Sequence, residues 1–311
     1  GVVINVLLIN EEFAMAVDSK GELWMWGKSD VILGQLTGGI KPYPTKVDSS
    51  YFGNAKIKKI AGSLGTAKGA TYTNASTAIV IDENGKVWTW GNNLHGELGN
   101  GTETASTIPV CISDDKNEVL YGVEMQQIEI SCGTHVVGLD TNGTIWAWGG
   151  NSEYGQAGVA DNTNMITVPQ TIDTFYNEHF EYNLKFKKVE VAKNYDQNLA
   201  IDEEGKVWVW GDNNYNSLGI KNGSNKIKNP TVLDIPGNPK IKKISASSYS
   251  TIMVSEDGRV YIAGRCYLGN GIGETKYSYN SFGITEITNN FDLSKDVYIA
   301  DVEAIGYAQV L

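Results

Sequence analysis

The sequence predicts an all-β fold, a β-propeller of four-stranded antiparallel blades, and a repeated tryptophan motif carries this prediction. All eight tryptophans of the 311-residue chain fall in four W-x-W pairs, each followed by glycine: Trp24/Trp26, Trp88/Trp90, Trp146/Trp148 and Trp208/Trp210. The first Trp of each pair recurs after 64, 58 and 62 residues, and Tyr261–Gly264 is a degenerate fifth copy. A repeat of this length and strand-like content is typical of one propeller blade.

A tight hairpin precedes each W-x-W pair. Asp82–Gly85 separates two short apolar runs, and Asn and Gly tolerate the positive φ that such a turn needs. The same turn recurs at Asp18–Gly21, Asp140–Gly143, Asp202–Gly205 and Ser255–Gly258. In the strand after the turn, Trp88 and Trp90 are two residues apart, so they lie on one face of the sheet and can fill the space between blades. We therefore interpret the eight tryptophans as structural core and not as a ligand cage.

Two further strands complete each repeat. An apolar alternation precedes the hairpins, at Ile57–Ile60, Ile128–Ile130, Val189–Val191 and Ile241–Ile244. A proline-containing segment follows each W-x-W-G, at Pro44–Val47, Pro109–Ile112, Pro169–Ile172 and Pro230–Leu233. Because proline cannot donate to a ladder, this segment is predicted to be an outer edge strand.

The repeats divide the chain without a linker, which predicts a single propeller domain over residues 1–311. The repeats lie near 4–56, 57–127, 128–188, 189–240 and 241–300, with a partial sixth at 301–311. Both ends carry the same part of the repeat and the first residue is Gly1, so we expect an excerpt of a longer protein, a processed chain or an unusual closing blade. The continuous apolar run Val2–Ile9 predicts a strand buried on both faces, next to residues 301–311.

The phrase G-x-x-H-x-x-x-L-D-x-x-G-x-x-W-x-W-G, carried best by residues 133–149 and 85–101, resembles the repeat of the regulator of chromosome condensation family. The resemblance covers nearly the whole chain. It implies a propeller that acts as a rigid interaction platform. Members of the family include a chromatin-bound exchange factor for a small GTPase, domains of ubiquitin ligases and a secreted bacterial inhibitor of β-lactamases, so the fold alone does not decide the function.

The composition restricts the partners. A net charge of −11 argues against a nucleic-acid-binding surface, which needs clustered Lys and Arg, and no apolar run is long enough to insert into a membrane. The three cysteines, Cys111, Cys132 and Cys266, are too few and too far apart for a disulfide framework or a metal site, so we expect buried apolar fillers. High Asn, Lys and Ile with few Pro indicate a bacterial-type member. We favour a secreted or cell-surface part of a larger protein over a cytoplasmic one.

Catalytic and metal-binding patterns are weak. Of the three histidines, His95 and His135 occupy positions of the repeat and His179 lies alone in an insert. The turns Asp82–Gly85 and Asp202–Gly205 resemble the Asp-box turns of sialidases, but the spacing is one residue too long and the chain has only two arginines, Arg259 and Arg265. We therefore predict no enzyme activity, no cofactor and no metal, with a sialidase-like glycoside hydrolase as the less favoured alternative.

The predicted binding site lies on one face of the propeller. Since the strands alternate in direction, the turn between strands one and two and the loop between strands three and four emerge on the same face. These loops carry many tyrosines, which are common anchors of protein interfaces. The candidate partner-binding residues are Glu12, Thr134, Tyr195, Asp196 and Tyr249 from the first set, with Leu94, Tyr154, Tyr215 and Tyr267 from the second.

A second candidate patch lies in an aromatic insert on the other face, with Phe175, Tyr176, Phe180 and Tyr182. We therefore predict a non-catalytic module that binds another protein. A surface that binds a glycan or a peptide is the alternative.

Overall fold

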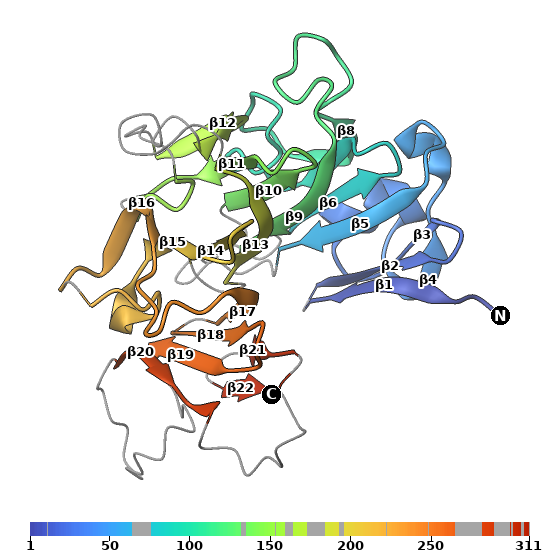
Figure 1. Cartoon of the computed structure of the whole chain (residues 1–311). Coiled ribbons are helices and arrows are strands. Elements are labelled where there is room, and N and C mark those ends of the chain that lie inside the picture. Colours follow the sequence, from blue (N-terminus) through green and yellow to red (C-terminus); the bar gives the residue numbers. More distant parts are fainter. Residues whose placement is uncertain are drawn as a thin grey trace. The chain divides into compact units, whose positions relative to one another are not determined.

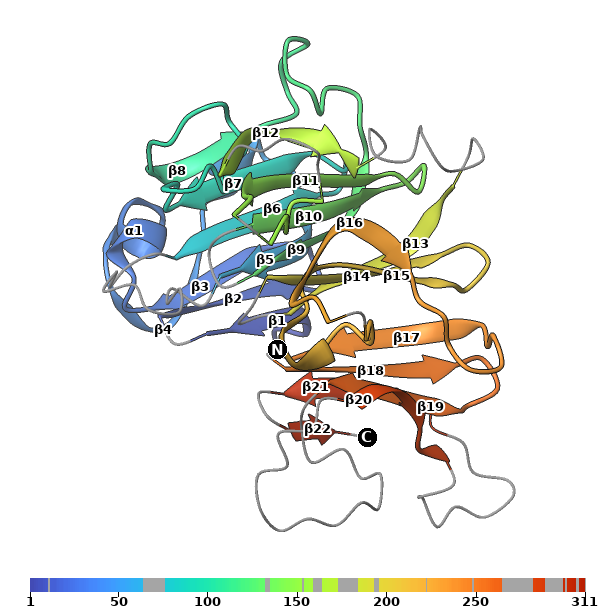
Figure 2. The same cartoon turned by 90° about the vertical axis from the view of Figure 1, so that its left-hand side faces the viewer.

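The computed structural model describes residues 1–10, 12–63, 76–131, 135–152, 154–158, 164–172, 184–192, 196–221, 223–247, 249–264, 282–288, 299, 301–305 and 308–310 (Figures 1 and 2). The chain separates into two compact units, and each is described by itself. Unit 1 comprises Gly1–Ser152 and Asp161–Thr174, and unit 2 comprises Glu153–Ala160 and Phe175–Leu311.

Unit 1 contains three four-stranded antiparallel sheets, named blades 1 to 3, whose strands follow one another in sequence order. Blade 1 consists of β1 (Ile4–Ile9), β2 (Phe13–Asp18), β3 (Leu23–Gly27) and β4 (Lys41–Lys46). Blade 2 consists of β5 (Ile57–Gly62), β6 (Thr77–Asp82), β7 (Val87–Gly91) and β8 (Ser106–Cys111). Blade 3 consists of β9 (Met125–Ile130), β10 (His135–Asp140), β11 (Ile145–Gly150) and β12 (Met165–Thr171). The short helix α1 (Asp30–Leu33), a π-helical turn (Gly34–Gly38) and a 3₁₀ turn (Ser49–Phe52) belong to the connections.

Unit 2 contains blades 4 and 5, and a short hairpin follows them. Blade 4 consists of β13 (Phe186–Val191), β14 (Gln197–Asp202), β15 (Val207–Asp212) and β16 (Lys226–Val232), with a 3₁₀ turn at Asn214–Asn216. Blade 5 consists of β17 (Ile241–Ala246), β18 (Ser250–Ser255), β19 (Val260–Gly264) and β20 (Phe282–Glu286). The hairpin pairs β21 (Glu303–Ile305) with β22 (Ala308–Val310). The predicted five blades and partial sixth are confirmed, and every W-x-W pair lies in the third strand of a blade.

The fourth strand of each blade is an edge of its sheet, as the prolines predicted. In blade 1 the ladder between β3 and β4 is interrupted between the pairs Met25–Thr45 and Gly27–Lys41, and Pro44 lies within this interruption. Pro109, Pro169 and Pro230 lie in the matching interruptions of blades 2, 3 and 4. The residue that lacks an N–H therefore stands where the ladder is already broken.

The first strand of blade 1 differs from its prediction. Val6 and Leu8 pack against the core of unit 1, but Ile4, Leu7 and Ile9 are 45 %, 55 % and 67 % exposed. Burial on both faces was therefore wrong, because β1 alternates its side chains between the core and a face that nothing covers in the part of the chain described. Its position next to residues 301–311 involves both units and stays a prediction.

The hairpin aspartate and the first tryptophan of each pair form one hydrogen-bonded unit. In blade 2, Asp82 is buried, and its Oδ1 accepts the backbone N–H groups of Asn84 and Lys86 at 2.8 and 3.1 Å. Its Oδ2 accepts the indole N–H of Trp88 at 3.1 Å. The same indole-to-aspartate bond measures 3.1, 3.0 and 2.9 Å in blades 1, 3 and 4. One carboxylate thus holds the turn and orients the tryptophan.

The second tryptophan of the pair joins one blade to the loop of the blade before it. Trp90 Nε1 donates to the carbonyl of Ile32 at 3.2 Å, and Trp148 Nε1 donates to the carbonyl of Glu97 at 2.8 Å, both within unit 1. Within unit 2, Trp210 Nε1 donates to the carbonyl of Gln156 at 3.1 Å. All three indoles are completely buried, which confirms that they fill the space between neighbouring blades. We call this contact the tryptophan–loop hydrogen bond.

A second connection between blades lies at the hairpin turns. Gly85 accepts the N–H of Met125, the first residue of the next blade, at 3.0 Å, and Glu83 N–H donates to Lys56 O at 2.7 Å. Gly85 has a φ of 79°, and a Cβ there would lie 2.8 Å from the Cα of Glu124. Only glycine fits a turn with this backbone and this neighbour. Each hairpin turn is therefore fixed against the strand that follows it.

Blade 5 lacks both tryptophans, and a threonine replaces one of their contacts. Ser255, Tyr261 and Ala263 stand where the other blades have Asp, the first Trp and the second Trp. Thr251 Oγ1 donates to the carbonyl of Ser217 at 2.8 Å, the loop carbonyl equivalent to that of Glu97. The acceptor of blade 4 is thus satisfied without an indole. The hydroxyl of Tyr261 is buried with no partner in the described part of the chain, and burial raises its pKa.

The buried tryptophans predict a large loss of stability on truncation. Replacing Trp88 or Trp146 by Ala is expected to lower the free energy of unfolding by about 3–5 kcal/mol, because the variant loses apolar burial and leaves a cavity. Thermal and urea unfolding measure this loss. Tyr121→Ala, at a side chain that is 56 % exposed, is the control and should be nearly neutral. Unfolding curves that match the parent would contradict the assigned role between the blades.

A milder substitution isolates the tryptophan–loop hydrogen bond. Trp148→Phe keeps a buried aromatic ring but leaves the carbonyl of Glu97 without its indole donor. We expect a loss of about 1–3 kcal/mol in the free energy of unfolding, the usual cost of a buried polar group without its partner. Urea unfolding of Trp148→Phe beside Tyr121→Phe separates this effect from a general effect of phenylalanine. Equal stability of the two variants would show that the bond contributes nothing.

The hairpin carboxylate of blade 1 predicts an acid-sensitive contribution to stability. Burial alone would raise the pKa of Asp18, but hydrogen bonds from the backbone of Glu22 and from the Trp24 indole outweigh it and lower the pKa below 3.8. A lowered folded-state pKa stabilises the protein above the unfolded value and is lost as the pH falls through the folded value. Asp18→Asn should therefore flatten the decline in stability below pH 3.8, whereas Glu103→Gln, at an exposed side chain, should not. Melting temperatures from pH 2 to about 6 test this.

Candidate functional site

Several predicted site residues lie outside the described part of the chain. Thr134, Tyr195 and Tyr267 belong to this group. So do all four residues of the second candidate patch: Phe175, Tyr176, Phe180 and Tyr182. The site is therefore built from Glu12, Leu94, Tyr154, Asp196, Tyr215 and Tyr249.

In unit 2, the turn between the first two strands of a blade lies beside the loop that follows the third strand of the blade before it. Asn198, at the start of β14, donates its side-chain N–H to the carbonyl of Gln156 at 2.9 Å. Thr251, at the start of β18, donates to the carbonyl of Ser217 at 2.8 Å. The two predicted sets of loops thus meet at the junctions between blades.

Tyr215 and Tyr249 form an aromatic pair at the junction of blades 4 and 5. Their ring centroids lie 5.2 Å apart and the planes meet at 84°, an edge-to-face geometry. Tyr215 comes from the loop after β15 and is 41 % exposed, whereas Tyr249 comes from the turn between β17 and β18 and is half-buried. The structure therefore brings together two predicted residues that are 34 positions apart in the sequence.

The loop that carries Tyr215 is fixed by Asn213. Its Oδ1 accepts the N–H of Leu218 at 3.1 Å, and its Nδ2 donates to the carbonyls of Ile220 and Ser224 at 2.8 and 2.9 Å. Tyr215 has a φ of 60°, which is uncommon for a bulky residue and costs of order 1 kcal/mol. The surrounding bonds hold this conformation, so the ring is presented in one orientation.

The other predicted residues have separate surroundings. In unit 1, Leu94 is 48 % exposed on the loop of blade 2, and Glu12 is paired with Lys28 at 3.2 Å in blade 1. In unit 2, half-buried Tyr154 lies in the loop beside blade 4, and the carbonyl of Asp196 accepts the N–H of Asp212 at 2.9 Å. Among the described site residues, a direct ring contact is seen for Tyr215 and Tyr249.

The polar groups that resemble catalytic pairs are inaccessible. Ser131 Oγ lies 2.9 Å from His135 Nδ1, but both residues are completely buried, so no substrate can reach them. Glu97 is also completely buried, and its carboxylate accepts the backbone N–H of His95 at 2.8 Å. Within the residues described, no three His, Cys, Asp or Glu side chains gather as a metal site would need. The helices in the same part of the chain are too short or too polar to cross a membrane.

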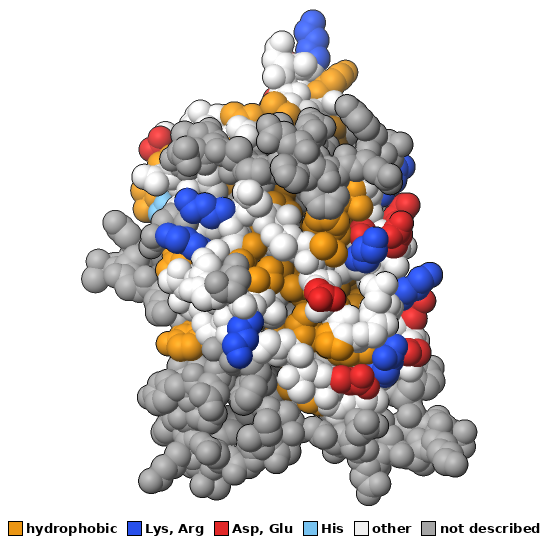
Figure 3. Space-filling model, turned by 60° about the vertical axis from the view of Figure 1, so that its left-hand side comes forward, with side chains coloured by type: hydrophobic (Ala, Val, Ile, Leu, Met, Phe, Trp, Pro, Cys, Tyr) orange, Lys and Arg blue, Asp and Glu red, His pale blue; other side chains and the backbone are white. Residues whose placement is uncertain are grey.

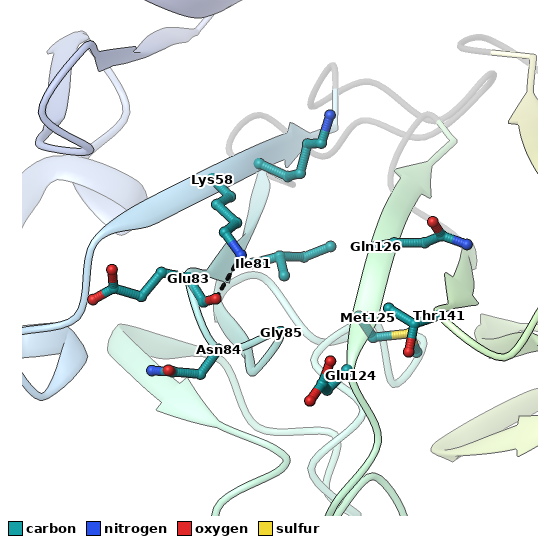
Figure 4. Close-up of a pocket in the computed structure, with 10 residues that line it drawn as sticks. Lys58, Ile81, Glu83, Asn84, Gly85, Glu124, Met125, Gln126 and Thr141 are labelled. Carbon is teal, nitrogen blue, oxygen red and sulfur yellow. Dashed lines mark hydrogen bonds between the residues drawn. The ribbon is translucent and has the colours of Figure 1, made fainter.

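Sequence reasoning missed a hollow of about 360 Å³ between blades 2 and 3 (Figure 4). Lys58, Glu83, Glu124 and Gln126 line it, and Ile81 lies beside them. Lys58 Nζ donates to the carbonyl of Glu83 at 2.5 Å, so this lysine already has a partner. The adjacent lysines in the first strand were a signal that could have located the hollow. Its charges are of both signs and do not select one kind of ligand.

A second missed hollow, of about 560 Å³, lies at the connection after blade 2. Cys111, Asp114, Glu118 and the exposed Tyr121 line it. The expectation that Cys111 is a buried filler was wrong, because it is half-buried beside Ser113, although partial burial raises its pKa. Figure 3 shows that one side of the molecule mixes hydrophobic patches with side chains of both charges.

Comparison with known proteins supports the repeat assignment. The family model of the regulator of chromosome condensation (RCC1) repeat matches residues 84–138 and 204–254, which run from a hairpin turn into the next blade. The chain is 25 % identical to the ultraviolet-B receptor UVR8 of Arabidopsis thaliana over 280 residues, which is 88 % of this chain and 56 % of the receptor. It is 26 % identical to the human E3 ubiquitin-protein ligase HERC2 over 79 % of this chain and 5 % of that protein. It is 32 % identical to the human X-linked retinitis pigmentosa GTPase regulator over 48 % of this chain and 13 % of that protein.

Solved structures show the same fold. Human WBSCR16 superposes with a TM-score of 0.68 at 15 % identity, covering 97 % of this chain and 70 % of that chain. Yeast RCC1 (Prp20), solved with Kap60 bound, also gives 0.68 at 19 % identity, covering 97 % of this chain and 66 % of that chain. The chain thus spans about half of UVR8 and about two thirds of these propellers. With its repeated hairpins, W-x-W strands and four-stranded blades, the chain is an RCC1-repeat β-propeller protein.

Proposed function

We propose that the chain is a non-catalytic module that binds another protein through the loops of one propeller face, with Tyr215 and Tyr249 as its anchor. The aromatic pair at the junction of blades 4 and 5 carries this proposal. Tyrosine offers a large contact area and a hydroxyl while losing little side-chain entropy. A ring that the loop already holds in place loses still less on binding.

The relatives support an interaction or regulatory role. Their names are those of a light receptor, a ubiquitin ligase and a GTPase regulator. Each of these relatives extends well beyond the matched part, so their whole activities cannot be carried over to this chain. What the chain shares with them is the repeat, and a rigid repeat scaffold that presents loops suits recognition of a partner.

The enzyme alternative finds little support in the described residues. Asp82 and Asp202, the Asp-box-like residues, are buried and already accept hydrogen bonds from their turns and from Trp88 and Trp208. Arg259 pairs with Asp257 at 2.9 Å and lies over the ring of Tyr261. These groups hold the blades and are not available to clamp a substrate carboxylate.

The class of partner follows from charge. A net charge of −11 disfavours nucleic acid, so we propose a protein partner, with a glycan or peptide as the alternative ligand. Aromatic rings can also stack on a sugar, so the glycan remains the arm to test beside the protein. Bacterial origin, attachment to a larger protein and a secreted or cell-surface location remain part of this proposal.

The proposal predicts a separation of binding from folding. Replacing Tyr195 and Tyr249 by Ser and Tyr215 by Gly should leave the melting temperature nearly unchanged, because glycine adopts the φ of 60° without strain. Affinity for the protein partner should fall by at least about 2 kcal/mol, roughly 30-fold. A pull-down from the native source with mass spectrometry identifies the partner, and calorimetry then compares the variants.

Tyr43→Ser is the matched control, because Tyr43 is 62 % exposed on the edge strand β4 of the other unit. It should bind like the parent. Unchanged affinity of the triple variant would reject this anchor and move the hypothesis to residues 175–182. A glycan array that binds the parent but not the triple variant would favour the alternative ligand.

A further inference from the structure

Blade 1 exposes apolar residues at positions that are buried in the other blades. The first strands share one register, in which an irregularity follows the first residue of the strand. Ile4 is 45 % exposed, but the equivalent residues are at most 4 % exposed: Ile57, Met125, Phe186 and Ile241. The same strand position therefore has different surroundings in blade 1.

Two more positions of the strand repeat this difference. Leu7 is 55 % exposed, whereas its equivalents Ile128, Val189 and Ile244 are at most 4 % exposed. Ile9 is 67 % exposed, whereas Ile130, Val191 and Ala246 are at most 5 % exposed. Ile4, Leu7 and Ile9 form an apolar stripe along β1, which we call the blade 1 stripe.

In the later blades, the equivalent residues pack against the preceding blade of the same unit. Ile57 and Trp90 of blade 2 share a core with Met15 and Met25 of blade 1. Ile241 and Ile244 of blade 5 likewise share a core with Leu199, Ile201 and Val209 of blade 4. The surface that covers this face is therefore known in detail from two places in the chain.

Trp26 gives an independent observation on the same face. Its equivalents Trp90, Trp148 and Trp210 are completely buried and donate to the loop of the preceding blade. Trp26 is half-exposed, and no described residue accepts its indole N–H. A buried face prepared in this way lacks both an apolar cover and one backbone carbonyl.

We propose that the blade 1 stripe and Trp26 form a docking face for another blade of the same repeat, supplied by the same polypeptide. Its second and third strands would cover Ile4, Leu7 and Ile9, and the loop after its third strand would give a carbonyl to Trp26. All the tryptophan–loop hydrogen bonds described here join consecutive repeats of one chain, and this face continues that interface. A second copy that paired its own blade 1 with this face would bury the stripe but bring no loop carbonyl to Trp26.

Charge substitutions in the complete polypeptide test the occupancy of the face. Leu7→Asp with Ile9→Asp should lower the melting temperature by about 5 °C or more, since a covered apolar stripe then receives buried carboxylates. Tyr43→Asp, at a residue equally exposed but outside the stripe, should have no such effect. Ile128→Asp marks the loss expected of a covered position. A parent-like melt of the Leu7/Ile9 variant would overturn the proposal.

Two further measurements apply to folded protein and do not depend on the stability of that variant. Light scattering should give one copy over a hundredfold range of concentration, and a dimer that Leu7→Asp dissociates would assign the face to a second copy. Hydrogen exchange of the Trp26 indole N–H, assigned with Trp26→Phe, should be at least about 100-fold slower than in the unfolded chain, like that of Trp90. Rapid exchange of Trp26 beside a protected Trp90 would show an open face and reject the proposal.

Discussion

The indole N–H of the second tryptophan in each pair, donated to the loop carbonyl of the preceding blade, is the contact on which the other features depend. In the cases described, a completely buried ring fills the space between two sheets while its one polar atom fixes a loop. The space for this contact is narrow. A Cβ on Gly99 would lie 2.9 Å from Nε1 of Trp148, so the loop can approach the indole only through glycine. Packing and hydrogen bonding thus select the same sequence.

The two ends of each blade are held by different chemistry. At the hairpin end, one buried aspartate satisfies its own turn and the first tryptophan, and the turn glycine bonds the next strand. At the other end, the tryptophan–loop hydrogen bond and an asparagine such as Asn213 fix the long loop. Polar groups that would cost free energy when buried are therefore paired within the repeat. The loops that carry Tyr215 and Tyr249 can present aromatic rings because the scaffold already orders their backbones.

Blade 5 shows which part of the repeat is replaceable. It has neither tryptophan, yet the carbonyl of Ser217 still has a donor, Thr251, and the sheet keeps the same strand order. The acceptor is conserved in function while the donor changes. Tyr261 takes the place of the first tryptophan and remains buried, but its hydroxyl has no partner within the described residues. The apolar volume is therefore the stricter requirement at this position.

The spacing of the W-x-W pairs, the hairpin aspartates and the edge prolines together determined the all-β class, the five blades and the strand assignments, because these features are local and repeat. They also placed the tyrosines on loops. They could not show that Tyr215 touches Tyr249, that Cys111 is half-buried or that β1 is covered on one face only. Such properties depend on which blade lies beside which loop, and tertiary packing decides this through contacts between residues far apart in the chain.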